Sequence, residues 1–141
     1  MFTTELLSGL WVGDTDILNS KTFMEDNKIG IILNCTTYFD FPDLPDIQKI
    51  RLPFSNDKNN DNDLILIREN KDKILSFIND NFDKHNILIV CYDGKSIGAF
   101  IVALYIAEYS NIDKKSIYDI LLTKDSSLSL WYDLSLFYNV N

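Results

Sequence analysis

The residues best suited to chemistry surround Cys91. This cysteine follows an apolar run, Ile87–Val90, that is typical of a buried strand, and a short polar loop separates it from a helical pattern that begins at Ser96. In such a turn the loop amides and the positive end of the helix point toward the sulfur. These features favour a thiolate that attacks a phosphoryl group. The candidate site is therefore the loop from Val90 to Gly98.

Apolar patterns predict the elements that position this loop. Short apolar or β-branched runs bounded by turn residues predict strands at Leu6–Val12, Ile29–Leu33, Lys49–Pro53 and Ile87–Val90. Helical spacing and capping residues predict helices at 16–27, Leu64–Phe82, Ser96–Tyr109, Lys114–Leu122 and Leu128–Val140. Because strands alternate with helices, we expect an α/β fold with a central, mostly parallel sheet and helices on both faces.

Length and composition narrow the class of protein. The chain has 141 residues, which fits a single domain spanning 1–141. Its net charge of −8 disfavours nucleic acid as a partner, and the apolar runs are too short for a membrane span. The N-terminus lacks a signal-peptide pattern, so an intracellular, cytoplasmic location is expected. Cys35 and Cys91 are the only cysteines and are expected to be reduced.

Four segments resemble the dual-specificity branch of the cysteine-dependent protein phosphatases, including its small poxvirus members. Leu6–Gly13 resembles the first strand of that family, and Ile29–Thr36 resembles the strand before the variable loop. Ile50–Asp57 resembles the loop that carries the general acid, and Val90–Ile97 resembles the phosphate-binding loop. The resemblance covers nearly the whole chain and implies a single-domain cysteine-phosphatase-like fold.

The same resemblance implies that three chemical groups are missing. In the family a histidine precedes the nucleophile, an arginine that grips phosphate with two parallel hydrogen bonds closes the loop, and a hydroxyl group follows it. Here these positions hold Val90, Ile97 and Gly98. Cys91 is then a vestigial nucleophile in a degenerate phosphate loop, whose remaining members are Tyr92, Asp93, Gly94, Lys95 and Ser96.

Asp93 changes the charge of the loop further. It stands where the resemblance places a small apolar residue, close to the expected phosphate. A carboxylate there opposes phosphate binding and raises the pKa of Cys91, which keeps the thiol neutral. Lys95 offers only a mobile point charge in place of a planar guanidinium fork.

The general-acid position also departs from the family pattern. The offset from Pro53 places Asn56 where the acid of the family stands, with Asp57 one residue beyond. Asp57 is the vestigial general-acid candidate, and Asp61 is the alternative if the loop moves. The whole polar run Asn56–Asp63 is more typical of a solvated loop than of a catalytic one, since nearly every residue is Asn, Asp or Lys.

The favoured function is that of a catalytically inactive phosphatase-like protein, a pseudophosphatase, that binds or scaffolds an unidentified client protein. A weak thiol-dependent phosphatase that uses Lys95 and the helix end, or a module that binds phosphorylated ligands without hydrolysis, are the alternatives. No cluster has metal-ligand spacing, and neither a metal nor a cofactor is expected. If the source is viral, the host cell or the virion is the expected location, and the oligomeric state is left open.

Overall fold

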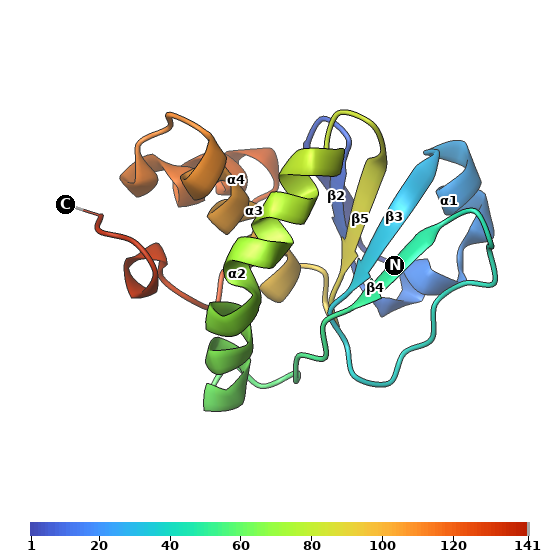
Figure 1. Cartoon of the computed structure of the whole chain (residues 1–141), viewed down its shortest axis with the longest axis horizontal. Coiled ribbons are helices and arrows are strands. Elements are labelled where there is room, and N and C mark those ends of the chain that lie inside the picture. The colour runs from blue at the N-terminus through green and yellow to red at the C-terminus, as the bar shows by residue number, and fades with distance from the viewer. Residues whose placement is uncertain (141) are drawn as a thin grey trace.

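The computed structural model describes residues 1–140, so residue 141 of the expected domain lies outside the described residues. Its sheet follows the order β1-β2-β5-β3-β4 (Figure 1). Only β1 and β2 are antiparallel, and the other neighbouring strands are parallel. The prediction of a mostly parallel sheet is therefore confirmed. The strands are β1 (Thr3–Leu7), β2 (Leu10–Gly13), β3 (Ile29–Asn34), β4 (Gln48–Arg51) and β5 (Asn86–Val90).

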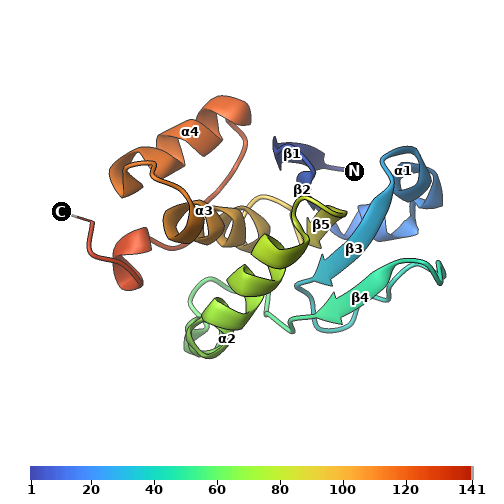
Figure 2. The ribbon, with the colours of Figure 1, turned by 45° about the horizontal axis from the view of Figure 1, so that its top comes forward.

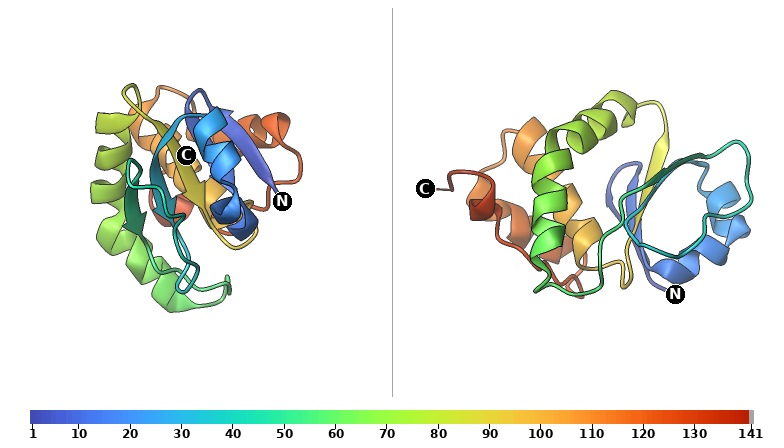
Figure 3. Two further views of the ribbon diagram at one scale, coloured as in Figure 1. Left: turned by 90° about the vertical axis from the view of Figure 1, so that its right-hand side faces the viewer. Right: turned by 60° about the horizontal axis from the view of Figure 1, so that its bottom comes forward.

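Helices cover both faces of this sheet, as predicted. Figures 2 and 3 show α1 on one face, with α2 and α3 on the other. Short 3-10 turns at Thr15–Asn19, Lys114–Ser116 and Leu134–Leu136 complete the connections. The helices are α1 (Lys21–Asp26), α2 (Asp61–Asn81), α3 (Ile97–Tyr109) and α4 (Ile117–Lys124).

The central strand β5 contributes to two separate cores. Ile87 and Ile89 belong to the larger core, which includes residues of α2 and α3, while Leu88 and Val90 belong to the smaller core on the side of α1. All four side chains are fully buried. Because successive side chains of a strand point to opposite faces, a continuous apolar run marks a strand that is covered on both sides.

Helix α3, which follows the candidate loop, is buried almost completely. Every residue from Ile97 to Ala107 is buried, so this helix is apolar on all sides. The aromatic ring of Phe100 contacts Tyr132 and Phe137 of the C-terminal segment, with ring centroids 5.4 and 5.8 Å apart. The C-terminal segment thus covers part of α3, which α2 and α4 also contact.

Two predicted elements were wrong. The expected strand Leu6–Val12 is a hairpin of β1 and β2, because Gly9 turns the chain in a left-handed conformation with a φ of +83°. The expected closing helix Leu128–Val140 contains only the short turn Leu134–Leu136. Its buried side chains, Leu128, Tyr132 and Leu134, lack the regular spacing of a helix and anchor the segment one by one.

Two further boundaries were misplaced. Asn60 caps α2 by accepting a hydrogen bond from the Asn62 amide (3.0 Å), so the helix begins at Asp61 and takes up the end of the expected loop. Acidic side chains in this first turn are favourable beside the positive helix end. The predicted helix 16–27 is divided at Ser20, which ends the first 3-10 turn and caps α1.

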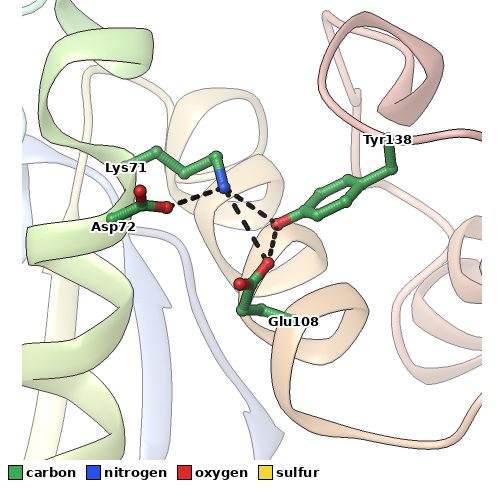
Figure 4. A network of polar contacts seen from close by, with 4 residues as sticks. All are labelled: Lys71, Asp72, Glu108 and Tyr138. Carbon is green, nitrogen blue, oxygen red and sulfur yellow. Dashed lines mark hydrogen bonds and ion pairs between the residues drawn. The ribbon is translucent and has the colours of Figure 1, made fainter.

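A polar network joins the C-terminal segment to α2 and α3. The amino group of Lys71 contacts Asp72 (3.0 Å), Glu108 (3.8 Å) and the hydroxyl of Tyr138 (3.5 Å), as Figure 4 shows. The Tyr138 hydroxyl donates a hydrogen bond to Glu108 (2.7 Å). The network pairs the charge of Lys71, whose side chain is only 17% exposed.

We expect Tyr138→Phe to lower the free energy of unfolding by about 1 kcal/mol, because it removes a hydrogen bond to a partly exposed carboxylate. Tyr138→Ala should lower it further, since the ring that lies over Lys71 is also lost. Urea denaturation measures both changes. Tyr38→Phe is the matched control, because Tyr38 is 88% exposed. Equal losses for Tyr138→Phe and Tyr38→Phe would contradict the role of the network.

Candidate functional site

The candidate loop lies where the carboxyl ends of the parallel strands meet. In the sheet Val90 pairs with Gly13 of β2 and with Asn34 of β3. The Cys91 amide continues this pairing by donating to the Gly13 carbonyl (3.1 Å), and the Cys35 amide donates to the Val90 carbonyl (2.7 Å). Loops at this edge are the usual ligand sites of open α/β sheets. Both cysteines are buried and carry free thiols.

Gly94 fixes the path of the loop. Its φ of +74° lies in the left-handed region, and a Cβ atom there would lie 2.6 Å from the carbonyl carbon of Gly13 and 2.7 Å from the Asp14 amide nitrogen. No side chain fits at that distance, so only glycine allows the loop to pack against the end of β2. Gly94, a member of the predicted loop, is thus required by close packing.

The carboxylate of Asp93 occupies the inside of the turn. Its Oδ1 atom accepts hydrogen bonds from the amides of Lys95 (2.9 Å) and Ser96 (3.1 Å) and from the Ser96 hydroxyl (2.9 Å). These donors lie directly before α3, where an anion would be favoured by the helix end. The loop therefore already binds an anion, which is its own side chain.

Cys91 lies next to this carboxylate. Its thiol donates to Asp93 Oδ1 (3.6 Å), and its Sγ atom accepts from the Gly98 amide (3.4 Å). Burial raises the pKa of Cys91, and the charge of Asp93 raises it further, whereas the amides of Gly98, Ser96 and Gly94 lower it. The net shift is upward, as expected from the sequence, although burial is a larger cause than the neighbouring charge.

The three substituted positions face the interior. Val90 is fully buried in the core beside α1, and Ile97 is 2% exposed in the core beside α3. A Cβ atom on Gly98 would lie 3.6 Å from the Cys91 sulfur, so the helix backbone passes close to the thiol. Apolar side chains thus stand where the resemblance places histidine and arginine.

Lys95 and both arginines direct their charged groups to partners other than Cys91. Lys95 is half-buried, and its amino group lies 4.9 Å from the centroid of the Phe2 ring. The guanidinium of Arg51 donates to the carbonyls of Thr36 (3.0 Å) and Phe39 (2.8 Å). Arg68, the other arginine, lies over Phe137. No arginine contacts Cys91 within residues 1–140.

The general-acid candidates do not contact Cys91 in the described residues. Asp57 is exposed, and its carboxylate accepts from the Asn59 amide (2.9 Å). Asn56 is also exposed, and Asp61 lies in the first turn of α2. In the described part of the chain none of these side chains contacts Cys91. The structure brings Asp93 to the thiol and leaves Asp57 in solvent.

Sequence reasoning missed the residues that hold the surrounding loops. Asp63 is buried and accepts from the Ser55 amide (3.0 Å) and hydroxyl (2.6 Å). The Tyr92 hydroxyl accepts from the Thr37 amide (3.1 Å) and donates to the Phe54 carbonyl (3.0 Å). An acid in the first turn of a helix is the only available signal for Asp63. Nothing in the sequence indicates the partners of Tyr92.

Residues 1–140 contain no group of three histidine, cysteine, aspartate or glutamate side chains placed to hold a metal ion. No helix in this range combines the length and apolar character needed to cross a membrane.

Comparison with solved structures identifies the fold. The chain matches human DUSP28 at 12% identity and a TM-score of 0.77, covering 91% of this chain and 84% of that one. It matches DUSP15 at 19% identity and a TM-score of 0.76, covering 91% of this chain and 79% of that one. It also matches a human tyrosine phosphatase-like serine/threonine/tyrosine-interacting protein. The identity is 14% and the TM-score 0.75, and the match covers 91% of this chain and 87% of that one. The fold is therefore that of the dual-specificity phosphatases. No protein-family model and no curated protein sequence matches the chain.

Asp93→Asn should lower the pKa of Cys91. The substitution removes a negative charge that disfavours the thiolate, while burial continues to hold the pKa above its ordinary value. Ultraviolet absorbance of the thiolate during a pH titration measures the shift, in a Cys35→Ala background that leaves one thiol. Asp16→Asn, a change at an exposed carboxylate, is the control. An unchanged or higher pKa in Asp93→Asn would contradict the electrostatic effect of Asp93.

Proposed function

We propose that this chain is a pseudophosphatase: a protein with the dual-specificity phosphatase fold that hydrolyses no phosphate ester and acts by binding another protein. The observation that carries this proposal is the position of Asp93. Its carboxylate accepts the hydrogen bonds of Lys95 and Ser96 that would otherwise be free for phosphate oxygens. A phosphorylated substrate would have to displace this internal anion.

The energies favour the internal carboxylate. A phosphate at ~4 Å from Asp93 is repelled by about 4 kcal/mol per pair of charges at an effective dielectric of ~20. Losing a transition-state donor of the arginine type costs roughly 3 kcal/mol more. The helix end returns only about 0.3 to 2 kcal/mol. The remaining amides therefore cannot compensate for the missing guanidinium.

The covalent step is also disfavoured. Attack on phosphorus needs a thiolate, whereas the raised pKa of Cys91 keeps the sulfur protonated and donating to Asp93. The leaving oxygen needs a proton, and Asp57, the acid nearest to the expected position, is directed to its own turn. Nucleophile and acid are therefore both unsuited to hydrolysis.

Binding of a protein is the function that such a scaffold retains. One structural neighbour is named a phosphatase-like interacting protein, which supports an interaction role for this fold. On this chain, Tyr38 and Phe39 are 88% and 45% exposed beside the loop that Tyr92 fastens. Exposed aromatic side chains are typical of contact surfaces between proteins.

A thermal-shift assay with tungstate, together with turnover of an aryl phosphate, tests the proposal. The wild type should show neither stabilisation nor turnover. Asp93→Ala frees the loop amides and should be stabilised by tungstate; at ten times the dissociation constant the gain is about 1.4 kcal/mol. Asp93→Asn is the matched control, because its side-chain oxygen can still accept from the amides without carrying a charge.

Three outcomes would contradict the proposal. Wild-type turnover that disappears in Cys91→Ser would indicate a thiol-dependent phosphatase. Wild-type binding of tungstate without turnover would indicate a module that captures phosphorylated ligands. Turnover in Asp93→Ala alone would contradict the part of the proposal that assigns inactivity to the missing guanidinium, because a single group would then block the site. The combination Val90→His, Asp93→Ala and Ile97→Arg requires circular dichroism first, because two of its positions are buried.

A further inference from the structure

The outer edge of the sheet carries a second feature, independent of Cys91. Strand β4 is the last strand of the sheet, and Figure 2 shows it with α2 nearby. A groove of about 250 Å³ lies between them. Its apolar walls include Ile50 of β4 and Leu52, which directly follows this strand. Ile74 and Phe77 of α2 form the opposite wall. Such a groove beside a free edge is suited to an extended peptide.

The backbone of β4 has unused hydrogen-bonding groups. The Leu52 amide donates to the Asn34 carbonyl of β3 (2.9 Å). Because backbone groups of successive residues in a strand point to opposite sides, those of Ile50 also face β3, and those of Lys49 and Arg51 face outward. Across residues 1–140, no backbone hydrogen bond beyond the sheet itself involves Lys49 or Arg51. These residues can therefore pair with an added strand.

The side chains of an added strand would meet the groove. Ile50 packs on the core beside α2, so this face of β4 continues into the groove. In a strand paired with β4, every second side chain would point to the same face and cover Ile74 and Phe77. The occupant should therefore carry apolar residues at alternate positions.

The charges at this edge select an acidic occupant. Lys49 and Arg51 lie on β4, and strand alternation places their side chains on the face opposite to Ile50. The Arg51 guanidinium is held by backbone carbonyls there, whereas Lys73 lines the groove itself from α2. Neither β4 nor the groove lining contains an aspartate or glutamate, although the chain has a net charge of −8. Pairing with a second copy through β4 would bring like charges together, which disfavours that occupant. The complementary partner is a segment with alternating apolar and acidic side chains.

We infer that β4 is a docking edge, at which an extended acidic segment of another protein adds a strand and places its apolar side chains in the groove against α2. This surface does not involve Cys91 or Asp93. The docking role is therefore independent of whether the candidate site hydrolyses phosphate. If no segment binds at β4, the proposed inactivity of the candidate site is unaffected.

A short fluorescent peptide in which isoleucine and glutamate alternate is the direct probe. Fluorescence anisotropy should show binding to the wild type. A peptide with alternate backbone amides methylated, and one with lysine in place of glutamate, should each bind about tenfold or more weakly. Amide hydrogen exchange at Lys49 and Arg51 should slow in the complex, because their outward amides become paired.

Variants of the protein separate backbone pairing from charge. Lys49→Pro removes the outward amide, and Lys49→Thr removes the same charge but keeps the amide. We expect the proline variant to bind about tenfold more weakly than the threonine variant. Lys49→Glu should weaken binding to a similar degree, because the acidic side chains of the added strand share its face, while Lys124→Glu on α4, the control for charge reversal, should not. If Lys49→Pro fails to fold, the methylated peptide tests the same hydrogen bonds.

Four results would overturn the inference. They are the absence of peptide binding at millimolar concentration, equal binding of the methylated peptide, and equal binding to the wild type and Lys49→Glu. The fourth is a wild-type dimer in sedimentation experiments that Lys49→Pro dissociates, because it would identify a second copy as the occupant.

Discussion

The hydrogen bonds between the Asp93 carboxylate and the amides before α3 determine the character of this molecule. They close the turn from the central strand to the most buried helix, a turn that also requires the left-handed backbone of Gly94. The start of a helix is otherwise suited to an external anion. Here the anion is covalently part of the loop, so the turn is complete without a ligand. The same arrangement that orders the fold at this point also fills its site.

The apolar substitutions act in the same direction as Asp93. Burying an isoleucine contributes about 1.5 to 3 kcal/mol relative to leaving it exposed, and Ile97 is 2% exposed. An arginine at that position would instead need a phosphate to compensate its charge in the interior. Functional sites commonly carry such unfavourable groups at a cost in stability. In this chain the core extends through Val90 and Ile97, and that cost is absent.

Sequence patterns predicted the elements of this fold better than the contacts between them. The apolar run Ile87–Val90 revealed a strand covered on both faces, because burial on two sides leaves a continuous signal. The C-terminal segment was mispredicted, since its aromatic residues are held by contacts with Phe100 and α2, which are distant in sequence. The charge of Asp93 was visible, but its hydrogen bonds depend on the turn geometry. Arg51 gave no sign that its guanidinium would bind the Thr36 and Phe39 carbonyls.

A free sheet edge is a hazard that proteins usually limit with charged residues, and Lys49 and Arg51 serve that purpose on β4. This protective role and a docking role are compatible, because both follow from the same electrostatics. Two cations on one strand repel an identical strand and attract an acidic one. What distinguishes β4 from a merely protected edge is the apolar groove beside it, in which Ile74 and Phe77 are only partly buried. Positive charge on the strand and uncovered apolar surface next to it together favour a specific partner.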